Sequence, residues 1–255
     1  METRIDNLVK WIREQVPEGG KAIIGISGGK DSTIAAALCV EALGAENVIG
    51  VMMPNGVQHD INDSKRVCEL LGIFSLEVNM EDAYEGIRDA IGMALLNKHV
   101  VSPFERVYNN GMIRTNLPAR IRMTTLYAVA ALYPNSRVVN TCNYSEDYVG
   151  YSTKYGDAAG DFSPLGNLTV REVLEIGDAL GLPSHLVHKA PSDGMCGKTD
   201  EDNLGFTYEE LDDYIMHGKA PRTQETYERI TRLHRTTRHK YEPMPVFNPV
   251  VLEEE

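Results

Sequence analysis

A segment rich in glycine and serine near the start of the chain has residue types that bind phosphate. It reads Gly25-Ile-Ser-Gly-Gly-Lys-Asp-Ser32, after an apolar run and before a helical pattern. At a junction between a strand and a helix, free backbone N–H groups and the positive end of the helix point to one spot. Glycine lets the backbone approach a ligand closely, and serine adds hydroxyl donors. Asp31 would repel a phosphate unless a cation lay between them, so the segment predicts a phosphate site with Mg²⁺.

Two familiar phosphate motifs do not fit this segment. A Walker A loop needs Ser or Thr after its Gly-Lys pair, but Lys30 is followed by Asp31. The dinucleotide pattern Gly-x-Gly-x-x-Gly also fails, because Ser27 stands two residues after Gly25. The alternative interpretation is a turn that only caps a helix, and the register of strand, loop and helix favours the phosphate site.

A second polar segment runs from Thr141 to Leu165, directly after an apolar strand pattern. The carboxyl ends of parallel strands meet at one edge of a sheet, where ligands of open α/β sheets bind, so we expect both segments to meet there. Glu146 can then join Asp31 on Mg²⁺, and Lys154 can offset an anionic substrate. A solvated loop would explain the polarity, but not the strand before it or the tyrosines within it.

Alternating strand and helix patterns must position these segments. Three strand–helix units at this rhythm predict a doubly wound, open parallel sheet with helices on both faces, an α/β fold. We expect an amphipathic helix from Asn7 to Val16 ahead of them. The expected strands span 22–26, 47–53, 73–78 and 138–141, and the expected helices of the repeating units span 32–43 and 61–71.

The second half of the chain carries fewer periodic signals. Residues 98–116 are expected to form an irregular crossover, and Pro118 is expected to open a helix to Leu132. Capping patterns at Thr169 and Thr207 each predict the start of a further helix. Without a repeat or a low-complexity linker, residues 1–255 are interpreted as a single domain.

Composition limits the partners. The formal net charge is −12 with a pI near 5.1, which argues against non-specific binding to nucleic acid or to anionic membranes. The N-terminal residues contain no apolar signal-peptide stretch, so we expect a cytoplasmic protein. The four cysteines have no CxxC spacing, and Cys39 and Cys68 are expected to be core thiols.

A local excess of basic residues lies between Arg222 and Lys240. A solvated helix face explains most of its arginines. The end of the run, His239-Lys240, also suits an anionic dinucleotide.

The motifs together resemble those of the NAD synthetase family. The pattern SGGxDS at 27–32 resembles the pyrophosphate loop of N-type ATP pyrophosphatases, which the family shares. The resemblance continues in order almost along the whole chain, through 120–127, 143–146, 150–165, 189–192, 199–205, 208–214 and 239–240.

The resemblance implies a Rossmann-like fold of the ATP pyrophosphatase type and a role for each matching residue. Asp31 and Ser27 would be catalytic, and Asp31 and Glu146 would bind Mg²⁺. Deamido-NAD would meet Arg120, Lys154, Asp161, His239 and Lys240. The residues implied to contact ATP are Gly25, Ile26, Ser27, Gly28, Gly29, Lys30, Asp31, Ser32, Thr141, Val170 and Ser192.

Two positions depart from the family pattern. Val170 stands where many relatives have a lysine that contacts ATP, so it could offer only backbone contact. Lys198 stands where relatives often have glutamine, and it is either a loop residue over the phosphates or a solvated lysine.

The implied reaction joins ammonia to deamido-NAD with ATP as co-substrate, through an adenylate, and gives AMP, pyrophosphate and NAD. Another ATP pyrophosphatase, forming GMP or modifying tRNA, and a non-catalytic nucleotide sensor are the alternatives. The sequence length leaves no room for a glutaminase domain beside the adenylating core, which favours free ammonia. The resemblance also implies a homodimer, and no nucleic-acid or membrane partner.

Overall fold

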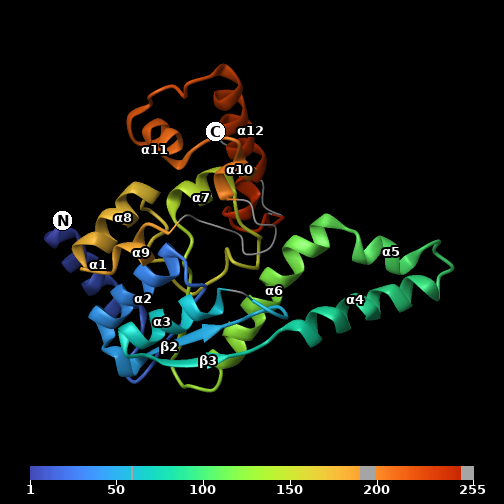
Figure 1. Cartoon of the computed structure of the whole chain (residues 1–255), viewed down its shortest axis with the longest axis horizontal. Helices are drawn as coiled ribbons and strands as arrows, with labels where there is room; N and C mark the ends of the chain where they lie inside the picture. The colour runs from blue at the N-terminus through green and yellow to red at the C-terminus, as the bar shows by residue number, and fades with distance from the viewer. Residues whose placement is uncertain (59, 190–198, 248–255) are drawn as a thin grey trace, which may run out of the picture.

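The computed structural model describes residues 1–58, 60–189 and 199–247. Eighteen elements lie in these ranges, and Figure 1 shows their arrangement. In chain order they are α1 (Glu2–Gln15), β1 (Ala22–Gly25), α2 (Lys30–Leu43), η1 (Ala45–Asn47), β2 (Val48–Met52), α3 (Ile61–Leu71), β3 (Phe74–Glu77), α4 (Glu81–Leu96), α5 (Pro103–Tyr108), α6 (Gly111–Ala130), β4 (Arg137–Val139), α7 (Tyr144–Val149), α8 (Val170–Ala179), α9 (Ser184–Val187), α10 (Asp200–Leu204), α11 (Tyr208–His217), α12 (Gln224–Thr237) and η2 (Arg238–Lys240).

The four strands form one parallel sheet in the order β3-β2-β1-β4. Parallel strands need helical crossovers, which cover both faces, so the central strands β1 and β2 are apolar along their length. On β1, Ala22 and Ile24 face one hydrophobic cluster, whereas Ile23 faces another. The predicted α/β fold with helices on both faces is therefore confirmed.

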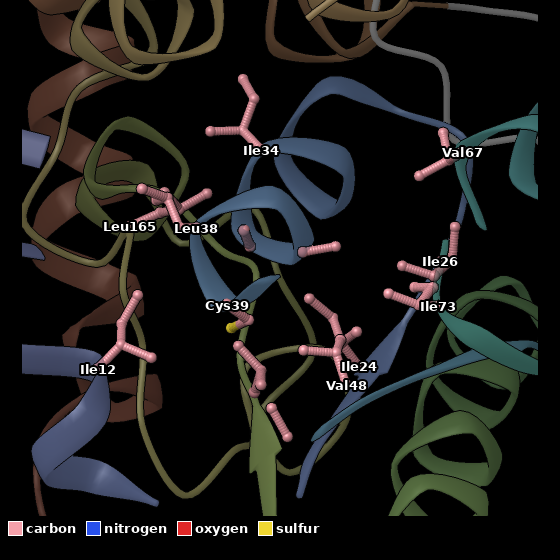
Figure 2. Packing of buried hydrophobic residues seen from close by; sticks show 14 of the residues in the cluster. Ile12, Ile24, Ile26, Ile34, Leu38, Cys39, Val48, Val67, Ile73 and Leu165 are labelled. Atoms are coloured by element: carbon pink, nitrogen blue, oxygen red, sulfur yellow. The ribbon is translucent and has the colours of Figure 1, made fainter. Parts of the chain in front are cut away.

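The larger cluster joins the sheet to α1, α2, α3 and α8. Figure 2 shows Ile34, Leu38 and Cys39 of α2 packed between Ile12 of α1 and Ile24 of β1. Ile12, Ile34 and Leu38 are fully buried, so α2 is held on several sides and fixes the loop that precedes it. The second cluster packs α6 and the start of α4 against the opposite face, through Met80, Tyr84, Ile121 and Val129.

A helical arm leaves the sheet beyond the second cluster. Figure 1 shows α4 and α5 extending away from the strands, and α6 returning to them. The expectation of an irregular crossover at 98–116 was wrong, because α5 and the first turns of α6 occupy it.

The expected start of a helix at Pro118 was also wrong. Asn110 caps α6 by accepting a hydrogen bond from the Ile113 amide at 3.0 Å, so the helix begins at Gly111. Pro118 lies inside that helix, where it lacks the N–H that would bond to the carbonyl of Arg114. The cap decides where this helix begins, and the proline is tolerated inside it.

The other capping predictions were confirmed. Thr169 and Glu172 form a reciprocal capping box at the start of α8, and the hydroxyl of Thr207 accepts from the Glu210 amide at the start of α11. Cys39 and Cys68 are buried core thiols, as expected. Within the described ranges, no helix is both long and apolar enough to cross a lipid bilayer.

Candidate active site

The loop between β1 and α2 has the geometry of an anion-binding turn. The Ser27 and Ser32 hydroxyls lie 3.1 Å apart, and the amide of Gly29 donates to Ser27 Oγ at 3.2 Å. No side chain of the described residues caps the N-terminus of α2, which begins at Lys30. The first amides of this helix are therefore available to an anion, and phosphate binding at this loop stays a prediction.

Gly28 is required by the shape of this loop. Its φ is +76°, and a Cβ there would lie 2.9 Å from both Asp63 Cβ and the backbone N of Ser64. Any other residue would combine backbone strain with a clash against the start of α3. The loop that leads into α2 therefore packs directly against the start of α3.

The segment after β4 reaches the same sheet edge and touches this loop. The Asn143 side chain donates through Nδ2 to Asp31 Oδ1 at 3.1 Å. It also caps α7: Asn143 Oδ1 accepts from the Glu146 amide at 3.0 Å, and Glu146 Oε2 accepts from the Asn143 amide at 3.2 Å. Asn143 is fully buried and contacts both carboxylates, so the predicted meeting of the two segments is confirmed.

The electrostatics of this pair favour a cation. Burial and the charge of Asp31 raise the pKa of Glu146 well above its ordinary value, while the charge of Lys30 acts to lower it. Two carboxylates that repel each other in a confined site are stabilised by a bound divalent cation. The residues therefore fit Mg²⁺, although among the described residues no further His, Cys, Asp or Glu completes a three-residue cluster.

Two residues at this site were not assigned a role from the sequence. Tyr208, at the start of α11, is buried, and its hydroxyl has no hydrogen-bond partner among the described residues. Burial and the charges of Glu146, Asp200 and Asp31 raise the pKa of Tyr208. Asp200 begins α10 and is also buried. Both come from the segment after residue 198, and no local pattern links them to the loop at 25–32.

Three of the residues predicted to meet deamido-NAD form a chain of contacts. Arg120 Nε donates to the carbonyl of Lys154 at 3.4 Å, and Lys154 Nζ donates to the carbonyl of His239. The contacts join α6, the loop after α7 and η2. Substrate binding by these side chains stays a prediction.

Lys240, in η2, also contacts the loop after α7. Its Nζ donates to the carbonyls of Gly150 and Ser152, each at 2.6 Å. Burial lowers the pKa of Lys240, whereas the charge of Asp157 acts to raise it. The ammonium thus orders the turn that leads to Lys154.

Asp161 is placed elsewhere, beside strand β4. Its Oδ2 accepts from the Val138 amide at 2.7 Å, and its Oδ1 accepts from the Tyr127 hydroxyl at 3.3 Å. The carboxylate therefore holds the segment after residue 157 against β4 and α6. No contact described in the structure joins it to Lys154 or Lys240.

Three further predicted ATP contacts have different placements. Thr141 follows β4 at the sheet edge and is partly exposed. Val170 is buried against α11 and α12, and its amide donates to Ser145 Oγ at 3.1 Å. Ser192 and Lys198 lie outside the described residues. Contact of these residues with ATP stays a prediction.

Most arginines between Arg222 and Lys240 are exposed, which confirms the predicted solvated helix face for most of this run. Arg232 and Arg235 on α12 are exposed, as are Arg222 and Arg238 beside it. Arg229 differs, because it is partly buried and donates to the carbonyl of Asn203 at 3.0 Å.

Several known proteins are similar to this chain over most of its length. The family model described as NAD synthase matches residues 4–244. The NH(3)-dependent NAD(+) synthetase of Alkaliphilus metalliredigens is 37% identical over 96% of this chain and 98% of its own. That of Thermococcus kodakarensis is 40% identical over 83% and 78% of the two chains.

Two solved structures are similar over almost the whole chain. The NMN synthetase of Francisella tularensis has a TM-score of 0.82 and 34% identity, covering 97% of this chain and 98% of that one. The NH3-dependent NAD synthetase of Campylobacter jejuni has a TM-score of 0.72 and 26% identity, covering 97% and 99%.

Proposed function

The chain belongs to the NAD synthase family, and from this premise we propose that it is an ammonia-dependent NAD synthetase. It would join ammonia to the nicotinate carboxylate of deamido-NAD, with ATP as co-substrate and AMP, pyrophosphate and NAD as products. The observation that carries the proposal is the hydrogen bond from Asn143 to Asp31, which brings the phosphate loop and the α7 carboxylate to one place.

The reaction needs positioning more than a protein nucleophile. A carboxylate is a poor electrophile, so its oxygen would first attack the α-phosphorus of ATP. The bond from that phosphorus to the bridging oxygen breaks, and pyrophosphate leaves. Ammonia then attacks the acyl carbon of the adenylate, and AMP leaves with the bonding pair. The site would contribute orientation and charge stabilisation.

The loop residues would hold the triphosphate. Ser27 Oγ and the amides at the start of α2 would bind the departing pyrophosphate, because both face the anion position described above. Gly25 to Ser32 and Thr141 are proposed to enclose the nucleotide, and Ser192 to contact it.

Asp31 and Glu146 are proposed to hold Mg²⁺. When bound, that ion would neutralise charge that develops on the phosphate oxygens. The support is the repulsion between the two carboxylates, since both would be ionised beside the cation.

Deamido-NAD is proposed to lie along the chain of contacts from Arg120 through Lys154 to His239, with Lys240 supporting the loop. The charges of Arg120, Lys154 and Lys240 offset the anionic dinucleotide against an acidic chain of net charge −12. Asp161 is proposed to contact the same substrate.

We also propose a cytoplasmic homodimer in which residues 1–255 act as a single unit. Apolar side chains exposed on the arm support the dimer, since large apolar patches on a surface mark interfaces. They include Ile87, Ile91, Met93 and Leu96 of α4, and Met112 of α6. Sedimentation at several concentrations tests this: the wild type should sediment as a dimer and Ile91→Glu as a 28.3 kDa monomer. A wild type that stays monomeric would refute the dimer.

A second acceptor is favoured by one observation. The structure with a TM-score of 0.82 is that of an NMN synthetase. Nicotinate mononucleotide carries the same carboxylate, so the same chemistry would amidate it. This candidate differs from the first only in the length of the acceptor.

One assay tests both candidates. The protein is mixed with Mg-ATP, ammonium and either deamido-NAD or nicotinate mononucleotide, and the amide product and AMP are measured together. NAD and AMP in equal amounts, with the higher kcat/KM for deamido-NAD, support the proposal. A higher kcat/KM for the mononucleotide supports the second candidate. ADP as product, or AMP without an amide, would exclude both.

A further inference from the structure

The Lys30 side chain is buried instead of extending into solvent. Its ammonium lies 2.7 Å from Asp31 Oδ2, and its side chain is only 4% exposed. The ammonium is 5.7 Å from the ring centroid of Tyr208, which covers it from α11. The lysine of the phosphate loop is therefore turned inward.

The surroundings of this ammonium are acidic. Burial alone would lower the pKa of Lys30, but the charges of Asp31, Glu146 and Asp200 raise it above its ordinary value. A lysine is almost never fully buried unless it is paired with opposite charge. These carboxylates come from α2, α7 and α10, three elements far apart in the sequence.

Tyr208 also helps to bury the Lys30 ammonium, and its hydroxyl lies in the same acidic surroundings. It is buried near the charges of the same carboxylates, and no residue within 1–58, 60–189 or 199–247 forms a hydrogen bond with it. The ring therefore separates Lys30 from solvent without neutralising it. The ammonium is a positive charge that acts on all three carboxylates, and it forms an ion pair with Asp31.

We propose that Lys30 is a positioning residue, a resident counter-charge that holds Asp31 and Glu146 together before a divalent cation arrives. This inference rests on the proposed function, because it takes these two carboxylates as the ligands of Mg²⁺. An ammonium that is paired with Asp31 at 2.7 Å and acts on the charge of Glu146 repels a free divalent cation. The cation then binds well only when the negative charge of ATP accompanies it.

The test is a titration of the protein with Mn²⁺ alone, without nucleotide or substrate, followed by the EPR signal of free Mn²⁺. Lys30→Met removes the charge and keeps an unbranched side chain of similar length. It should bind Mn²⁺ at least about tenfold more tightly than the wild type, equivalent to about 1.4 kcal/mol. Lys65→Met is the matched control, because Lys65 is paired with Glu77 on α3 and β3 and its loss changes the net charge equally. The control should bind Mn²⁺ as the wild type does.

Unchanged or weaker Mn²⁺ binding by Lys30→Met would overturn the proposal. If that variant does not fold by circular dichroism, the wild type still decides: a tight Mn²⁺ site without nucleotide that is lost in Asp31→Asn would overturn it, and weak binding would support it. No substrate is present, so this titration reads the cation site alone. The amidation assay reads the proposed function separately.

Discussion

Asn143→Asp separates two roles that one side chain performs. Aspartate caps helices as well as asparagine does, so the Oδ1 bond from the Glu146 amide, 3.0 Å in the wild type, should survive. The substitution removes the Nδ2 donor that lies 3.1 Å from Asp31 Oδ1 and places a carboxylate there instead. The fold should persist while Asp31 and Glu146, the proposed Mg²⁺ ligands, lose their link.

The size of the effect follows from the bond that is lost. A hydrogen bond to a charged group contributes about 1.5–3 kcal/mol, and each 1.4 kcal/mol is about tenfold. If Asp31 must be held in place for turnover, kcat/KM for ATP should fall by about 10- to 100-fold or more, because the new charge also repels Asp31. The assay is initial-rate formation of the amide product at varied Mg-ATP.

Asn110→Asp is the matched control. Asn110 caps α6 in the same way, accepting from the Ile113 amide at 3.0 Å, but it is exposed. Its aspartate variant should keep kcat/KM within about twofold, since a surface substitution of this kind changes little. A rate for Asn143→Asp within threefold of the wild type, or an equal loss in the control, would refute the reasoning.

Three further predictions concern the loop, the metal site and a buried acid. Gly28→Ala should lower the free energy of unfolding in urea by more than Gly72→Ala, because both residues have positive φ but only Gly28 lacks space for a Cβ. For Gly72→Ala the expected loss is about 1 kcal/mol. Equal losses for the two variants would contradict the clash at Gly28. Asp31→Ala should abolish product formation while circular dichroism stays unchanged, and near-normal turnover would remove Asp31 from the site. Burial raises the pKa of Asp147 to about 7, so the folded state binds an extra proton between about pH 4 and 7. The Asp147 carboxyl therefore lowers the free energy of unfolding more and more as pH rises through that range, by a few kcal/mol at most at pH 8. Asp147→Asn should raise the melting temperature at pH 8 but not at pH 4, and an equal change at both would contradict the assignment.

Local signals in the sequence were sufficient for the strands and for the starts of four helices, α2, α3, α8 and α11. The loop at 25–32 and the capping box at Thr169 each depend on residues that are close together in the sequence, so their positions could be predicted. The arm could not, because α6 begins at an asparagine cap and continues through Pro118. A proline inside a helix contradicts its usual preference, and packing of Ile121 and Val129 against the sheet outweighs that cost.

The site was predictable only in part for a related reason. Asp31 and Glu146 could be paired because each follows a parallel strand. The inward turn of Lys30 could not be predicted, since it depends on Asp200 and Tyr208, which reach the loop through tertiary packing. Sequence reasoning identifies which residues gather at a sheet edge, and packing decides which way each of them points.

The long-range contacts at the sheet edge set the order in which the site can be made on the ribosome. Asp31 meets its partner Asn143 across a sequence separation of 112 residues, and Lys154 meets the carbonyl of His239 across 85. At about 5–20 residues per second, the phosphate loop leaves the ribosome roughly 5–20 s before the asparagine that holds its aspartate. During that interval the acidic loop is a local structure without its partners. Binding competence is therefore gained late in synthesis, when the segment up to Lys240 closes over the loop after α7.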